Sequence, residues 1–333
     1  MFASPALAAA PPAEAITPAL IAAAKKEGGM VWYTSADLQL AEKVGRAFEQ
    51  KFPGVGARVE RAGGERIFSR LAQEYATGIH VADAVSTGDA AQFIAWKRQD
   101  WLAPYVPDDV ARYIPAEHRD PDGCYATVRS SLCVLGYNTE MVKREDAPKG
   151  FYDLLDSKWK GKIVKAHPSY SGTIMTATYQ LVRELGWPYL EKLSKQQVMQ
   201  IQSATDTPKK VELGERPVMA DGNESNVFIL KEAGKPVDVI YAVEGSPTIV
   251  QPSAVFRAAP HPNAARLFQN YLFTPEAQQL FVDIGGLRSL HAQVKDKPGR
   301  TPLSAIKVWK DDPAAVEVQG DEIKRRYSRY FGV

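Results

Sequence analysis

The sequence predicts an α/β protein made of two halves, each a mostly parallel sheet with helices on its faces. Short apolar runs alternate with segments whose apolar residues recur at helical spacing, as in β-loop-α units. Polar turns follow these runs, and the alternation occurs in two separate series, before residue 100 and after residue 160. The length of 333 residues exceeds what one hydrophobic core usually supports, so two domains are expected.

The first series contains three strand-helix units. The predicted strands are 30–34, 55–61 and 81–85, and the predicted helices are 36–52, 67–77 and 90–96. Ligands of such sheets bind at the carboxyl ends of the strands. The turns at 34–35, 63–65 and 87–89 are therefore expected to face a ligand.

The second series begins after an excursion rich in proline. Its predicted strands are 162–165, 217–220 and 237–242, and its predicted helices are 174–185 and 225–233. Helices are also expected over 262–273, from residue 275, and over 321–330, and extended segments near 125–135 and 245–257 join the two halves. We assign residues 28–127 plus 251–290 to lobe 1 and residues 128–250 plus 291–333 to lobe 2.

Charge and composition narrow the class of partner. Lys and Arg number 41 against 39 Asp and Glu, which gives no electrostatic case for nucleic acid or an anionic membrane. A small molecule is the expected partner, and no stretch is long and apolar enough to span a bilayer.

The N-terminal residues are small and mildly apolar. Residues 6–8, Ala-Leu-Ala, have the small-x-small form that signal peptidase cleaves. We expect residues 1–27 to be the remnant of an export signal, with a disordered segment rich in Ala and Pro as the alternative.

Cys124 and Cys133 are the two cysteines, and they lie nine residues apart in one extended segment. At about 3.3 Å per residue they are too distant for a disulfide unless the strand turns back. We expect two free, buried thiols. The five histidines are scattered singly, so the sequence predicts no metal site and no cofactor.

Seven stretches between residues 30 and 290 carry a family resemblance. They are VWYTS (31–35), RDPDG (119–123), VLGYNT (134–139), DLLDSKWKGK (153–162), SGT (171–173), APHPNAA (259–265) and TPEAQQ (274–279). In this order they resemble the extracellular solute-binding proteins of ABC importers, within the ferric-iron, phosphonate and sugar-phosphate-like group of the type II periplasmic-binding fold. The resemblance implies two lobes that close on a ligand in the cleft between them, a periplasmic location, and delivery of the ligand to a membrane permease. We expect a monomer.

The chain departs from the ferric members at the residues that would bind the iron ion. Those members resemble one another in carrying two adjacent tyrosines at the turn that here reads DGNESN (221–226). Phenolate oxygens suit a hard trivalent ion, and this turn contains none. Iron(III) would require phenolates from Tyr33, Tyr137 or Tyr170.

The 171–173 turn is the best candidate for anion binding. A strand that passes through Ser171, Gly172 and Thr173 into a helix presents unpaired N–H groups and the positive end of the helix dipole. The alternative is plain helix capping by Ser171. Tyr170 could stack on a ligand or simply cover the rim of the cleft.

Arg129 lies on the first crossover, in an otherwise uncharged strand, and could hold a carboxylate bidentately. The alternative is a surface salt bridge. Ser131 shares its face of the strand.

The remaining candidates are strand-end residues, which could equally cap helices, and residues of the 221–226 turn. The expected ligand-binding set is Thr34, Ser35, Thr87, Gly88, Arg129, Ser131, Tyr170, Ser171, Gly172, Thr173, Asn223, Glu224 and Asn226. Contact with Glu224 would favour a ligand that also carries an amine or hydroxyls.

The leading functional hypothesis is the binding component of an importer for a small organic anion: a phosphonate, a phosphorylated metabolite or a carboxylate. An iron(III)-binding protein is the alternative within transport. An enzyme on the same fold is the alternative of another class, but the sequence contains no G-x-S-x-G, no H-E-x-x-H and no P-loop. Docking on a membrane sensor instead of a permease stays open.

Overall fold

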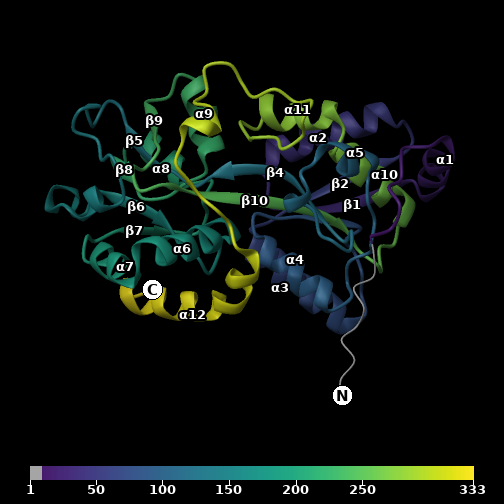
Figure 1. Ribbon diagram of the computed structural model, residues 1–333, viewed down its shortest axis with the longest axis horizontal. Coiled ribbons are helices and arrows are strands. Elements are labelled where there is room, and N and C mark those ends of the chain that lie inside the picture. Colours follow the sequence, from purple (N-terminus) through teal and green to yellow (C-terminus); the bar gives the residue numbers. More distant parts are fainter. Residues whose placement is uncertain (1–9) are drawn as a thin grey trace.

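Two sheets, each flanked by helices, form two lobes joined by long strands (Figure 1). The computed structural model describes residues 10–333. The first sheet has the order β11-β10-β3-β1-β2, with β4 paired to β10, and the second has the order β7-β6-β8-β5-β9. This arrangement confirms the predicted two-lobed α/β fold.

Lobe 1 is built on the first sheet. Its strands are β1 (Gly29–Thr34), β2 (Gly56–Arg61), β3 (Ala84–Ser86), β4 (Ala126–Leu132), β10 (Ser246–Val255) and β11 (Val308–Trp309). Its helices are α1 (Pro18–Glu27), α2 (Leu38–Lys51), α3 (Gly64–Thr77), α4 (Ala90–Arg98), α5 (Asp108–Tyr113), α10 (Pro262–Leu272) and α11 (Pro275–Asp283). Strands β1, β2 and β3 are parallel, whereas β10 runs antiparallel to β3 and β4.

Lobe 2 is built on the second sheet. Its strands are β5 (Leu135–Asn138), β6 (Ile163–Ala166), β7 (Met199–Ile201), β8 (Val218–Met219) and β9 (Val237–Ile240). Its helices are α6 (Gly172–Leu185), α7 (Trp187–Ser194), α8 (Thr207–Glu212) and α9 (Glu224–Glu232). Strand β6 is parallel to β7 and β8, and β5 is antiparallel to β8 and β9.

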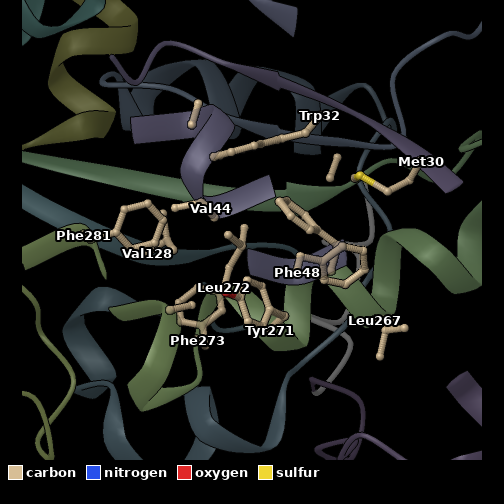
Figure 2. Packing of buried hydrophobic residues seen from close by; sticks show 14 of the residues in the cluster. Met30, Trp32, Val44, Phe48, Val128, Leu267, Tyr271, Leu272, Phe273 and Phe281 are labelled. Carbon is tan, nitrogen blue, oxygen red and sulfur yellow. The ribbon is translucent and has the colours of Figure 1, made fainter. Parts of the chain in front are cut away.

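The core of lobe 1 is aromatic. On α2 the apolar side chains of Leu40, Val44 and Phe48 lie at helical spacing and are buried. The ring of Phe48 lies 5.1 Å from that of Phe268 and 5.5 Å from that of Tyr271. Figure 2 shows this cluster between the sheet and α10, where it fixes α2 and therefore the turn that precedes it.

The N-terminal boundary requires a correction. Residues 1–9, which include the small-x-small motif at 6–8, lie outside the described residues, but residues 10–27 are part of lobe 1. The Thr17 side chain accepts a hydrogen bond from the Leu20 N–H at the start of α1, and Gly28 ends this helix in the left-handed conformation. Because α1 packs on α10, the alternative of a disordered segment does not hold for residues 18–27.

The C-terminal residues contact both lobes. Strand β11 pairs with β10 in the first sheet, but Trp309 of this strand is buried in the core of lobe 2, the lobe to which residues 291–333 are assigned. The last helix, α12 (Pro313–Phe331), begins eight residues earlier than predicted because Asp312 caps it and Pro313 occupies its first turn. It packs against α4 of lobe 1 and against α6 and α7 of lobe 2.

Two further expectations concern the thiols and the membrane. Cys124 and Cys133 are both free and buried, as predicted. Within residues 10–333 no helix combines the length and the apolar character needed to cross a bilayer.

Truncating the core of lobe 1 should be costly. We expect Phe48→Ala to lower the free energy of unfolding by about 3–5 kcal/mol, because the lost ring leaves a cavity among Phe52, Phe268 and Tyr271. Leu38→Ala, on an exposed position of the same helix, should change it by less than about 0.5 kcal/mol. Urea unfolding followed by circular dichroism measures both, and equal effects would contradict this account of the core.

Candidate ligand-binding site

A polar cavity of about 150 Å³ lies between the two lobes, where the carboxyl ends of strands from both sheets meet. Lobe 1 contributes turns that follow β1, β2 and β3, and lobe 2 contributes turns that follow β6, β7 and β8. The lining residues are Ser35, Arg61, Gly63, Gly64, Arg66, Gly88, Tyr170, Ser171, Gly172, Thr173, Gln202, Ser203, Ala204, Thr205, Asp206 and Asn223. The cavity therefore occupies the position predicted for ligands of parallel sheets.

The 171–173 turn forms one wall of this cavity at the N-terminus of α6. Ser171 caps the helix, since its Oγ accepts a hydrogen bond from the Ile174 N–H at 3.4 Å. The first N–H groups of a helix have no partner within the helix, so Gly172 and Thr173 present donors at the cavity wall. Ser171 therefore both caps α6 and lines the cavity.

Glycines let the two lobes approach each other across the cavity. A Cβ atom on Gly172 would lie 2.6 Å from the Cβ of Asp89 in lobe 1, and a Cβ on Gly88 would overlap the Thr173 hydroxyl of lobe 2. At the rim, Arg66 of α3 donates a hydrogen bond to the Gln202 side chain at 3.1 Å. The structure thus describes a closed arrangement.

Arg129 lies below this cavity, on the crossover strand β4, and its side chain is fully buried. Its Nε donates a hydrogen bond to the Gln251 side chain of β10 at 2.8 Å, while Nη1 and Nη2 have no partner among residues 10–333. Burial lowers the pKa of Arg129 to about 10, so the guanidinium remains charged at neutral pH. The predicted alternative of a surface salt bridge does not apply.

Arg129 lines a second, smaller cavity of about 30 Å³. Ser35, Thr173, Thr205 and Asn223 line both cavities and separate them. Asn226, another predicted residue, also borders the smaller cavity. The structure therefore gathers nine predicted residues around two adjoining spaces: Ser35, Gly88, Arg129, Tyr170, Ser171, Gly172, Thr173, Asn223 and Asn226.

Three predicted hydroxyl residues do not border either cavity. The Thr34 hydroxyl is 2.9 Å from that of Ser86, and the Thr87 hydroxyl donates to the Gln92 side chain at 2.9 Å. The Ser131 hydroxyl donates to the Leu132 carbonyl at 3.3 Å. These groups are buried and hydrogen-bonded inside the lobes, so the structure does not place them at either cavity.

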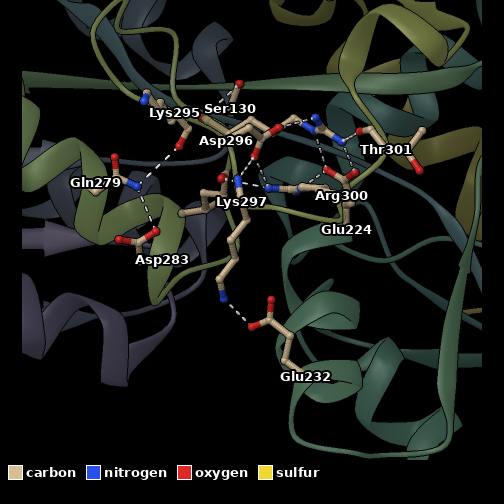
Figure 3. Close-up of polar contacts among 12 residues, drawn as sticks. Ser130, Glu224, Glu232, Gln279, Asp283, Lys295, Asp296, Lys297, Arg300 and Thr301 are labelled. Atoms are coloured by element: carbon tan, nitrogen blue, oxygen red, sulfur yellow. Dashed lines mark hydrogen bonds and ion pairs between the residues drawn. The ribbon is translucent and has the colours of Figure 1, made fainter.

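Glu224 was expected to touch the ligand, but its carboxylate is completely buried and turned away from both cavities. It forms ion pairs of 2.7 Å with Arg288 and with Arg300, and it accepts a hydrogen bond from the Tyr241 hydroxyl at 2.7 Å. Figure 3 shows Glu224 beside Arg300, with Asp296 completing the cluster. The guanidinium groups of Arg288 and Arg300 bind the carboxylate, so Glu224 anchors the start of α9. Its neighbour Asn223 lines the cavity.

A second buried ion pair joins two turns of lobe 2. Lys165, at the end of β6, lies 2.6 Å from the carboxylate of Asp221 after β8, and both side chains are buried. The same carboxylate accepts a hydrogen bond from the Ala166 N–H at 3.0 Å. Burial raises the pKa of Asp221 and the charge of Lys165 opposes that rise. This pair fixes the 167–173 turn relative to the 221–226 turn.

The sequence reasoning missed the turn at 202–206 and the two arginines Arg61 and Arg66. The missed turn follows β7 and reads Gln-Ser-Ala-Thr-Asp before Thr207 and Pro208 begin α8. A short strand followed by hydroxyl residues at a helix start is the pattern also found at 171–173. The three-residue length of β7 hid it.

The tyrosines required for iron(III) do not converge. Tyr33 is buried in lobe 1, where its hydroxyl donates to the Glu74 carboxylate at 2.7 Å, and Tyr137 belongs to the core of lobe 2. Tyr170 borders the cavity. No group of three or more His, Cys, Asp or Glu side chains in the described chain could hold a metal ion.

The ion pairs of Glu224 should make a large contribution to stability. We expect Glu224→Gln to lower the free energy of unfolding by about 3–5 kcal/mol, because two buried guanidinium groups lose their shared anion. Glu232→Gln, at the exposed end of the same helix, should cost at most about 1 kcal/mol. Urea denaturation of the two variants measures the difference, and similar losses would contradict the role assigned to Glu224.

Comparisons with known proteins identify the family. The model of the family described as bacterial extracellular solute-binding protein matches residues 85–306, more than half of the chain. A probable ABC transporter periplasmic-binding protein of Sinorhizobium fredii is 27% identical over 155 residues, which cover 44% of this chain and 42% of that protein.

Solved structures show the same fold. The periplasmic binding protein AfuA from Actinobacillus pleuropneumoniae, with fructose-6-phosphate bound, superposes with a TM-score of 0.83 at 21% identity and covers 92% of this chain and 99% of its own. Iron-bound HitA from Pseudomonas aeruginosa has a TM-score of 0.78 at 20% identity, with coverages of 90% and 99%. Together with the family match, this confirms the resemblance found in the sequence: the chain belongs to the bacterial extracellular solute-binding proteins.

Proposed function

We propose that the protein captures a small organic anion, namely a phosphonate, a phosphorylated metabolite or a carboxylate, and delivers it to the membrane permease of an ABC importer. The observation that carries this proposal is the cavity between the lobes. It combines the N-terminus of α6 with the cationic side chains of Arg61 and Arg66, against one acidic lining residue, Asp206. Such a balance of charge suits an anion.

Binding would act through closure of the two lobes. The Ser35 hydroxyl of lobe 1, which accepts the Gly88 N–H at 3.1 Å, and the donors of lobe 2 at 171–173 reach a ligand together only when the lobes are close. A ligand that bridges them stabilises the closed state because the open state lacks half of these contacts. Nothing covalent happens to the ligand in this mechanism.

The comparisons bear on the choice of ligand. AfuA, whose structure contains fructose-6-phosphate, supports a phosphorylated metabolite for this chain, whereas iron-bound HitA would support iron(III). The separation of Tyr33, Tyr137 and Tyr170 favours the organic anion, since no pair of phenolates meets at the cavity.

The proposal also covers the cellular location of the protein and its oligomeric state. Export to the periplasm fits the family and the small-x-small residues at 6–8. The proposed protein is a monomer, and its net charge of +2 fits a protein that does not bind nucleic acid.

Isothermal titration calorimetry with phosphonates, sugar phosphates, other phosphorylated metabolites and small carboxylates tests the proposed function. We expect at least one compound to bind with micromolar or tighter affinity, and native mass spectrometry of the freshly purified protein to show a retained anion. Absence of binding across the panel, together with a visible charge-transfer band on addition of ferric citrate, would favour iron(III) instead.

Closure can be tested without removing a polar group. We expect Gly88→Ala to weaken binding of the tightest ligand of that panel by about tenfold, because the added methyl group meets Thr173 and holds the lobes apart. The fall in radius of gyration on ligand binding, measured by small-angle X-ray scattering, should shrink as well. Gly320→Ala, whose added methyl group meets nothing within 4 Å, is the matched control. Unchanged affinity in Gly88→Ala would mean that closure to this arrangement is not needed.

A further inference from the structure

The guanidinium of Arg129 is a buried cation without an anion. The other two buried arginines of the described chain, Arg288 and Arg300, both form ion pairs with Glu224. Arg129 has only the neutral side chain of Gln251 at Nε and the ring of Phe281, 5.5 Å from its Cζ. Burying an unpaired charge is strongly unfavourable, so its two free nitrogens call for a negative group that the protein does not supply.

The smaller cavity contains the space for such a group. Its volume of about 30 Å³ holds roughly two water-sized atoms, which matches the two oxygens of a carboxylate better than the four of a phosphate. Asp37 is the acidic residue that borders it, but the carboxylate of Asp37 caps α2 by accepting from the Gln39 N–H at 3.0 Å. No ion pair joins Asp37 to Arg129 among the residues described.

The region between the two cavities carries an unused acceptor. The side-chain oxygen of Asn223 is buried without a hydrogen-bond partner in the described structure, and Asn223 borders both spaces. A buried acceptor of this kind is expected to meet a donor. A hydroxyl group on a ligand that extends from one cavity into the other would provide it.

We propose that the ligand carries two anionic groups on a short linker that bears a hydroxyl: a phosphate-like group in the larger cavity beside residues 171–173, and a carboxylate on Arg129. This inference rests on the proposed function and narrows its ligand class to phosphorylated or phosphono hydroxy acids. Arg129 then sets specificity, because it distinguishes ligands that carry the second charge from ligands that do not.

A matched pair of probes tests the second charge. 3-Phosphoglycerate and glycerol 3-phosphate differ only in that the first has a carboxylate where the second has a hydroxymethyl group. We expect the wild-type protein to bind 3-phosphoglycerate about ten to a hundred times more tightly in calorimetry, the range of a charged hydrogen-bonded contact.

Two variants test whether the preference for 3-phosphoglycerate depends on Arg129. Arg129→Gln should bind both probes with equal affinity, close to the wild-type affinity for glycerol 3-phosphate, and Arg129→Lys should keep part of the preference. Without ligand, Arg129→Gln should be at least as resistant to urea as the wild type, because it loses a buried charge that has no partner. A purely structural arginine would give the opposite result, with loss of stability and equal loss of affinity for both probes.

The outcomes distinguish failure of this inference from failure of the proposed function. Equal wild-type affinity for the two probes would overturn the inference and leave anion binding intact. A preference that survives in Arg129→Gln would overturn the assignment of the carboxylate to Arg129. If the wild-type protein binds neither probe nor any other anion of the panel, the proposed function fails and the inference fails with it.

Discussion

The antiparallel pairing of β4 with β10 is the constraint on which the two-lobed arrangement depends. Both strands carry the chain between the lobes, and their register places Arg129 opposite Gln251. A third segment joins them, because Ser130 and Arg288 exchange backbone hydrogen bonds of 2.9 Å in both directions. Figure 1 shows β4 and β10 running side by side from one lobe to the other. Arg129 and Gln251, which line the smaller cavity, therefore lie on the strands that connect the two lobes.

Buried charge separates the residues that support the site from those that face it. Glu224 is matched by Arg288 and Arg300, and Lys165 is matched by Asp221. These ion pairs fix the turns of lobe 2. Their charges are not available to a ligand, because drawing one partner away would leave the other buried and uncompensated. Among the buried arginines of residues 10–333, Arg129 is the exception, and an exception of this kind is where an external partner is expected. The same comparison explains why Glu224, although adjacent to the cavity in sequence, has a supporting role.

Much of the fold could be predicted because local signals and tertiary structure agree. The strand-turn-helix units around Ser35 and Ser171 follow from apolar spacing, small hydroxyl residues and caps, and these signals placed the two halves of the cleft correctly. Side-chain direction could not be predicted in the same way. Asn223 and Glu224 are neighbours, yet only tertiary packing decides that one faces the cavity and the other faces two arginines. The turn after β7 escaped prediction because a strand of three residues has too few positions to show alternation.

The contacts that α12 makes with the two lobes are individually weak. The helix α12 touches both lobes, with ion pairs of 2.8 Å from Glu317 to Arg98 and 2.6 Å from Lys324 to Glu65. Solvent-accessible pairs of this type contribute at most about 1 kcal/mol each. A small apolar cluster adds to them, in which Val316 and Ile323 of α12 pack with Ala91, Met175 and Tyr179. Because neither contribution is large, we propose that the ligand between the lobes sets the balance between the open and the closed state. The proposed anion, bound by turns of both lobes and by Arg129 below them, would supply the contacts that decide this balance.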